Sequence, residues 1–170
     1  MEGFLLLILT AQTLGRPLVS KEASFTVVFP GDPVQDTMTV PTPEGPQLRR
    51  VFRYSDDDAV YLVVHTCMRP SKASSDPQEL LDLGREGNLK LTGGKLLSEK
   101  RISLDGHPGR DLIEEVGGQQ SYSRIFVGDL GAFYSLTASP RSSAATPKAL
   151  EFLESFKILP PSRHSACLGD

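Results

Sequence analysis

The segment Ala59–Met68 constrains the fold more than any other part of the sequence. If it is a strand, successive side chains alternate between two faces, with Val60, Leu62 and Val64 on one face. The other face carries Tyr61, Val63 and His65 and is also largely apolar. A strand that is apolar on both faces is typical of a sheet covered on both sides. We therefore expect a sheet with helices on each face, or with one helix and one layer of long loops.

The first of two predicted helices begins after Asp76. This residue is an N-cap acid, and Pro77 suits the first helical position, where its missing N–H group is not needed. Gly93 supplies the left-handed stop. The residues that recur at helical spacing, and that we expect to form the apolar face, are Leu80, Leu83, Gly87 and Leu91.

A second helix is predicted at Thr146-Pro147, which repeats the start signal, and it ends before Pro160. Strand patterns and turns rich in glycine, proline and aspartate occupy most of the remaining chain. The expected strands are residues 24–29, 36–40, 47–55, 59–68, 95–104, 110–116, 121–127 and 130–138. This order indicates a single α+β domain over residues 23–159, with an antiparallel sheet of about six to seven strands and helices packed on it.

Residues 1–15 are expected to be a signal-peptide-like leader rather than part of the domain. The run Phe4–Leu9 is the most apolar in the chain, and the apolar region around it is too short to span a bilayer as a helix. Glu2 is unusual in such a leader, and the alternative is a buried first helix. We expect residues 160–170 to form a loose C-terminal tail, and the mature chain to be extracytoplasmic (periplasmic or secreted) without a transmembrane segment.

Four features together resemble the PsbP-like superfamily, whose members are extracytoplasmic and accessory proteins with an α/β/α sandwich. These are Phe25–Gly31 near the start of the domain, the helix that follows the doubly apolar strand, the turn Gly106–Gly109 and the segment Ala149–Phe156. The resemblance covers roughly residues 23–159. It implies a role in binding or assembly, and it provides no catalytic motif that could be carried over residue by residue.

The charge of the chain argues against a nucleic-acid partner. Its formal net charge is −3, whereas nucleic-acid-binding domains usually show a strong basic excess. We expect a protein or a small ligand as the partner, and no cofactor.

Histidine and cysteine offer the main candidates for chemistry. His65 and Cys67 share a strand face, with their roots about 6–7 Å apart, and a nucleophilic cysteine needs such a base. The pair could also supply two zinc ligands, but no CxxC or HxxxH spacing completes a site. We favour a buried histidine beside a core cysteine, with no metal site and no enzymatic activity. The alternative is a hydrolase-like or metal-dependent enzyme that uses His65 and Cys67.

The two cysteines and the acidic run Asp56–Asp58 each allow a second, simpler interpretation. Cys67 and Cys167 could form a disulfide in an oxidising compartment, or Cys67 could be buried while Cys167 is free. The acidic run Asp56–Asp58 could contribute to a cleft or bind calcium, but it lacks the spacing and the glycine of a calcium loop. We interpret this run as a solvated hairpin tip.

Four residues are candidates for binding. Arg49 and Arg53 share a strand face and could border a groove for an anionic ligand or a partner, if that face is uncovered. His107 and Arg110 flank Pro108 in a predicted turn, which would make them an exposed contact loop. We therefore predict an exported, non-enzymatic binding or assembly-accessory domain, with a purely structural domain as the alternative.

Overall fold

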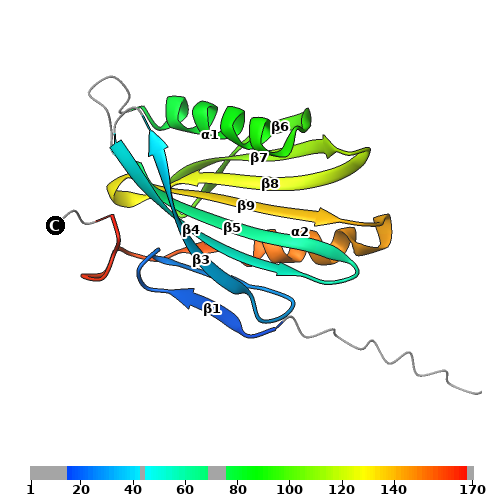
Figure 1. Ribbon diagram of the computed structural model, residues 1–170, viewed down its shortest axis with the longest axis horizontal. Coiled ribbons are helices and arrows are strands. Elements are labelled where there is room, and N and C mark those ends of the chain that lie inside the picture. The colour runs from blue at the N-terminus through cyan, green and yellow to red at the C-terminus, as the bar shows by residue number, and fades with distance from the viewer. Residues whose placement is uncertain (1–14, 43–44, 69–75, 168–170) are drawn as a thin grey trace, which may run out of the picture.

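The computed structural model describes residues 15–42, 45–68 and 76–167. Its middle layer is a seven-stranded antiparallel sheet in the order β3-β4-β5-β9-β8-β7-β6 (Figure 1). In chain order, these strands are β3 (Val34–Thr42), β4 (Gly45–Ser55), β5 (Ala59–Cys67), β6 (Lys95–Leu104), β7 (His107–Val116), β8 (Gln119–Val127) and β9 (Ala132–Pro140).

Two α-helices lie on opposite faces of this sheet. Helix α1 (Pro77–Thr92) buries Leu81 against a cluster that includes Ile125 of β8. Helix α2 (Thr146–Glu154) buries Phe152 in a second and larger cluster, which includes the adjacent β8 residue Phe126. Because successive strand residues point to opposite faces, the two clusters lie on opposite sides of the sheet. The expected α+β architecture is confirmed. No helix in the described part of the chain is both long and apolar enough to cross a bilayer.

A second, three-stranded sheet packs on the α2 side. It consists of β1 (Pro17–Ser20), β2 (Phe25–Val28) and β10 (Lys157–Ile158), in the order β1-β2-β10. Phe25 of β2 contacts Phe52 of the large sheet edge to face, with ring centroids 5.2 Å apart. The sequence patterns predict β2 but neither β1 nor β10. Two short 3₁₀ turns, η1 (Asp129–Gly131) and η2 (Ser143–Ala145), complete the elements.

The two ends of the domain extend beyond the predicted boundaries. Strand β1 lies before residue 23, and Gly15 and Arg16 precede it. The predicted loose tail is wrong for residues 160–167, because Cys167 is bonded to Cys67 of β5 and the Ala166 N–H group donates to the carbonyl of Glu22 (2.8 Å). Residues 168–170 and the predicted leader, apart from Gly15, lie outside the described residues, so the leader stays a prediction.

The face that helix α1 presents to the sheet is shifted from the predicted one, of which Leu80 packs against the core. Leu83 and Leu91 of the predicted apolar stripe are 55% and 75% exposed, whereas Leu81 is fully buried. The helix also turns Arg85 and Asn88 inward, toward carboxylates on β6 and β7. Buried carboxylates require hydrogen-bond donors, and polar helix residues provide them. The carboxylates of β6 and β7 need donors from α1, and this need determines which side of the helix faces the sheet.

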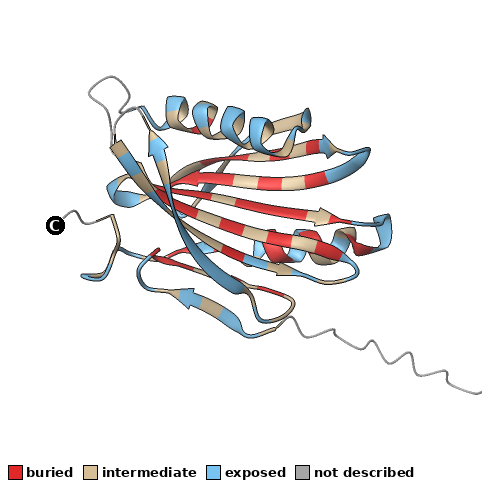
Figure 2. Cartoon of the chain, viewed as in Figure 1, coloured by how far each residue is buried: buried red, intermediate tan, exposed pale blue. Residues whose placement is uncertain are grey.

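Strand β5 is not covered equally on its two faces. Ala59, Tyr61 and Val63 are fully buried on the α2 side. Their neighbours Leu62 and Val64, on the other side, are only half-buried, as the alternating colours of β5 in Figure 2 show. Helix α1 packs mainly on β7 and β8, so it leaves this part of the sheet uncovered. The expectation that Ala59–Met68 is covered on both sides is therefore wrong for Leu62 and Val64, whereas Thr66 on the same side is buried.

Candidate functional site

The predicted contact loop at His107 and Arg110 is not an exposed loop. The turn between β6 and β7 is only Asp105-Gly106, with φ angles of 50° and 87°, and β7 begins at His107. His107 is half-buried at the start of the strand, and the side chain of Arg110 is only 4% exposed. The predicted exposure of Arg110 is therefore wrong, because the shorter turn places this residue inside the sheet, beneath α1.

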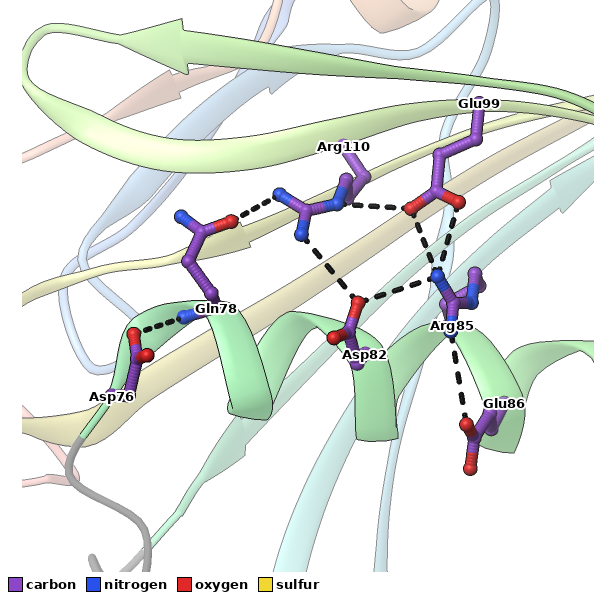
Figure 3. A network of polar contacts seen from close by, with 7 residues as sticks. All are labelled: Asp76, Gln78, Asp82, Arg85, Glu86, Glu99 and Arg110. Atoms are coloured by element: carbon purple, nitrogen blue, oxygen red, sulfur yellow. Dashed lines mark hydrogen bonds and ion pairs between the residues drawn. The ribbon is translucent and has the colours of Figure 1, made fainter.

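Arg110 is instead part of a charge network between α1 and the sheet (Figure 3). Its Nε donates to Glu99 of β6 (2.9 Å), and one terminal nitrogen donates to the amide oxygen of Gln78 on α1 (2.6 Å). The other terminal nitrogen lies 3.5 Å from a carboxylate oxygen of Asp82. Arg85 of α1 pairs with the same two acids, at 3.0 Å from Glu99 and 3.3 Å from Asp82. The network holds α1 on β6 and β7.

A second carboxylate below α1 has its own donors. Glu114 of β7 is fully buried and accepts hydrogen bonds from Asn88 (2.6 Å) and Thr92 (3.3 Å), both on α1. Buried charges persist where they are paired or hydrogen-bonded. Together with the Arg110 network, this contact means that polar side chains make much of the interface between α1 and the sheet.

Arg49 and Arg53 lie on the side of the sheet that carries α1, but beyond the area that α1 covers. Residues paired in register share a face, and the pairs Arg53–Leu62, Leu62–Thr137, Thr137–Ser123 and Ser123–Leu112 form one row across the sheet. Leu112 packs with α1, whereas Arg53 is exposed at the other end of the row. We call the α1-side surface of β3, β4 and β5 the open face; it includes Val34, Asp36, Met38, Arg49, Val51, Arg53, Leu62 and Val64.

The open face combines cationic and aliphatic side chains. Among the described residues, neither Arg49 nor Arg53 forms a salt bridge. Asp36 of β3 lies on the same face, opposite Val51, and its carboxylate accepts a hydrogen bond from the Thr37 N–H group (2.7 Å). Met38, opposite Arg49, is 44% exposed. The surface can thus offer two arginine charges beside apolar area.

His65 lies on the opposite side of β5, in a closed environment. The residue is 1% exposed, and its ring centroid lies 5.3 Å from that of Tyr134 on β9. Burial, and to a lesser degree the neighbouring Arg50 guanidinium, lower the pKa of His65 to about 4. The ring is therefore neutral at physiological pH. Its Nδ1 atom has no hydrogen-bond partner among the described residues.

The C-terminal segment brings a third residue to His65 and Cys67. Cys67 and Cys167 form a disulfide with a Cα–Cα distance of 5.3 Å, and the Cys167 Sγ lies 3.6 Å from the His65 Nε2. The ligand atoms of the three residues all lie within 4.8 Å of one another. In this state Cys67 has no free thiol to act as a nucleophile. Sequence spacing could not reveal the group, because Cys167 lies 100 residues beyond Cys67.

The acidic run Asp56–Asp58 stabilises the turn between β4 and β5. One carboxylate oxygen of Asp56 accepts from the N–H groups of Asp58 (3.0 Å) and Ala59 (2.9 Å), and the other accepts from Lys148 of α2 (3.2 Å). Burial alone would raise the pKa of Asp56, but these hydrogen bonds outweigh it and lower the pKa. For Lys148, burial alone would lower the pKa, but the hydrogen bond with Asp56 and the charges of Asp56 and Asp58 together outweigh burial. The pKa of Lys148 is therefore raised.

A hollow of about 290 Å³ lies elsewhere, where the start of β8 and the end of β9 meet the start of α2. Most of the residues that line it have polar side chains, among them Gln120, Arg141 and Ser143. None of the site residues predicted from the sequence line this hollow.

Comparisons with known proteins identify the fold. No family model matches the chain, and no curated protein matches it. The solution structure of cyanobacterial PsbP (CyanoP) from Synechocystis sp. PCC 6803 is similar, with a TM-score of 0.58 and 11% sequence identity, over 84% of this chain and 91% of that chain. A crystal structure of PA94 from Pseudomonas aeruginosa, a protein of unknown function, gives a TM-score of 0.41 and 16% identity, over 69% of this chain and 91% of that chain. The chain therefore has a PsbP-like fold.

Proposed function

We propose that this chain is an exported, non-enzymatic domain that binds a protein partner through the open face. The observation that carries the proposal is the part of the large sheet that α1 does not cover, where Arg49 and Arg53 stand beside aliphatic side chains. A PsbP-like fold is compatible with an accessory or binding role. The disulfide supports export, because disulfides persist in oxidising compartments.

The chemistry of the open face favours one kind of partner. Arginine is enriched at protein interfaces, where its planar group pairs with carboxylates and packs on apolar surface. Exposed aliphatic area beside such charges releases water when it is covered. We therefore propose a partner segment with acidic side chains on either side of an apolar centre.

The non-enzymatic part of the proposal rests on the residues that sequence analysis put forward for chemistry. Cys67 is held in a disulfide, and His65 is enclosed beside Tyr134. Asp56 is engaged with the turn and with Lys148. Cys67 and Asp56 thus have structural roles that require no substrate, and His65 is closed off from solvent.

The test is co-purification from the native host, followed by mass spectrometry. The variant Arg53→Glu places an acidic group on the open face, and we expect it to lose the partners that the wild-type chain recovers. Arg49→Glu should act in the same direction. Capture by the wild-type chain should also weaken at high salt, because screening reduces the attraction between exposed charges.

The matched control is Arg101→Glu, which makes the same charge change at an exposed position on the edge strand β6. This variant should recover the same partners as the wild-type chain. If Arg53→Glu and Arg49→Glu also recover them while remaining folded by circular dichroism, the open face is not the binding surface. If the wild-type chain recovers no specific partner, the purely structural alternative is favoured.

A further inference from the structure

The proposed function leaves one chemically distinctive cluster unused. His65, Cys67 and Cys167 each offer one atom that can bind a metal ion, and these atoms lie within 4.8 Å of one another. Imidazole nitrogen and thiolate sulfur are the ligands that zinc prefers in proteins. Two of the three residues come from β5, and the third comes from the segment that follows β10.

The spacing of these atoms is suited to zinc. Zinc–sulfur bonds of about 2.3 Å and zinc–nitrogen bonds of about 2.0–2.1 Å, at tetrahedral angles, place the two ligand atoms about 3.6 Å apart. The distance between the His65 Nε2 and the Cys167 Sγ is 3.6 Å. The two sulfur atoms are closer than in a zinc site only because they are bonded to each other. Their Cα atoms, 5.3 Å apart, need not move far for the sulfurs to separate.

Hydrogen bonds that do not involve the disulfide also hold Cys167 in place. The Ala166 N–H group donates to the Glu22 carbonyl (2.8 Å), and the Ser162 hydroxyl donates to the Lys21 carbonyl (3.3 Å). Cys167 itself packs against the large core cluster. The segment should therefore stay near β5 when the disulfide is reduced, with both thiols close to the buried imidazole.

We propose that reduction of the Cys67–Cys167 disulfide converts His65, Cys67 and Cys167 into a zinc-binding site. A dithiol reductant supplies two electrons and two protons to the disulfide and is itself oxidised to a disulfide. Zinc then binds one imidazole nitrogen and two thiolates, and the two thiol protons are released to solvent. The fourth zinc position is open among the described residues, where His65, Cys67 and Cys167 alone meet at this spot.

The charges around the cluster are compatible with this site. Arg50 lies opposite His65 on β4, and its Nε donates to Glu22 at 3.2 Å. Two thiolates neutralise the charge of one zinc ion, so the site as a whole would not repel the guanidinium. A nearby guanidinium also favours the thiolate form of cysteine.

The experiment measures zinc binding in two oxidation states. The full chain is purified with its disulfide intact, and one part is reduced with dithiothreitol that is then removed under anaerobic conditions. We expect one tightly bound zinc ion per reduced chain and none per oxidised chain, by elemental analysis after desalting. Cobalt added in place of zinc should give a thiolate-to-metal charge-transfer band in the reduced chain only.

The variant His65→Phe distinguishes the site from adventitious binding by thiols. It removes the imidazole but keeps a ring beside Tyr134, and both cysteines remain. We expect zinc affinity at least about tenfold weaker, since even changes to groups that only support a ligand cost about 10–100-fold. His164→Ala is the matched control, because His164 is exposed in the same C-terminal segment, and its zinc affinity should equal that of the wild-type chain.

Four outcomes would overturn the proposal. They are no stoichiometric zinc in the reduced chain, one zinc shared by two chains, equal affinities for His65→Phe and the wild-type chain, and loss of the native circular dichroism spectrum on reduction. The failure of this test leaves the open face untouched, because that surface lies on the other side of the large sheet.

Discussion

Arg110 shows how a single buried cation can connect two layers of the fold. A guanidinium group carries five N–H donors and needs several acceptors when it leaves water. Arg110 reaches Glu99 on the neighbouring strand and Gln78 on α1, and it forms an ion pair with Asp82 at 3.5 Å, the limit of a hydrogen bond. Because these acceptors belong to two elements, the side chain fixes the position of the helix relative to the sheet.

We therefore expect Arg110→Met to lower the free energy of unfolding by about 3 kcal/mol, since removing one partner of a buried charge pair leaves the other without compensation. The remaining pair of Arg85 and Glu99 should limit the loss. The control Arg101→Met, at the exposed position directly opposite on β6, should change stability by less than about 0.5 kcal/mol. Urea denaturation measures both values, and similar effects of the two variants would contradict a structural role for the network.

At the scale of single residues, the sequence indicates which side chains are candidates for a site, but it does not predict their burial or their neighbours from distant parts of the chain. The period of two placed Arg49 and Arg53 on one face because strand geometry is local. Arg110 was misplaced because its burial depends on a turn of only two residues and on a helix that precedes it in the chain. The nearness of Cys167 to His65 depends on the path of the whole chain, which no local pattern encodes.

At the scale of elements, helix α1 approaches the sheet closely at one glycine. A Cβ atom added at Gly84 would lie 2.1 Å from the ring of Phe133 on β9, whereas a Cβ added at Gly87 would meet no atom within 4 Å. Phe133 is itself buried in the cluster that contains Leu81, so its ring has little room to move. The missing side chain of Gly84 thus allows the helix to rest on β9.

The two glycines should respond to alanine with opposite signs. Alanine is a better helix former than glycine by about 1 kcal/mol, so Gly87→Ala should stabilise the domain by up to that amount. Gly84→Ala gains the same helix propensity but forces a clash in a packed core, which typically costs about 1–3 kcal/mol. We expect it to lower the melting temperature, while Gly87→Ala leaves it unchanged or raises it. Thermal unfolding of the pair would contradict the proposed close approach if Gly84→Ala were also stabilising.

The ends of α1 were predictable from the sequence, but its buried face was not. Asp76 accepts a hydrogen bond from the Gln78 N–H group (2.8 Å), and Gly93 adopts a left-handed conformation with φ 65°, as the local signals indicate. Leu83 and Leu91 of the predicted stripe face outward, whereas Leu80 packs against the core and polar residues of α1 face the carboxylates of the sheet. Capping is decided within a few residues, whereas the orientation of a helix depends on the surface on which it packs.

At the scale of the whole molecule, the order of long strands and capped helices was sufficient to predict the layers. The small sheet was harder to predict, because β1 and β10 have only four and two residues and carry little periodicity. The sequence named Arg49 and Arg53 as candidates only if their face is uncovered, and it could not decide that condition for a related reason. An apolar strand pattern cannot distinguish a surface covered by a helix from one that is half-exposed and available to a partner.

The C-terminal segment closes the fold through the disulfide. Cys67 and Cys167 are 100 residues apart in sequence, so the bond removes a large amount of conformational freedom from the unfolded chain. Because Cys167 packs against the core cluster, the bond also holds the C-terminal segment close to β1 and β2. Its loss should therefore affect the stability of the whole domain rather than that of one end.

We expect Cys167→Ser to lower the free energy of unfolding by about 2–5 kcal/mol under oxidising conditions. The comparison is best made by urea denaturation with a chelator present, so that metal binding does not contribute. Under reducing conditions the variant and the wild-type chain should unfold at nearly the same urea concentration, because both then lack the bond. Equal stability under oxidising conditions would mean that the disulfide adds nothing to the stability of the folded unit. A loss restricted to oxidising conditions would assign the stabilisation to the bond itself, beyond the hydrogen bonds that the C-terminal segment makes.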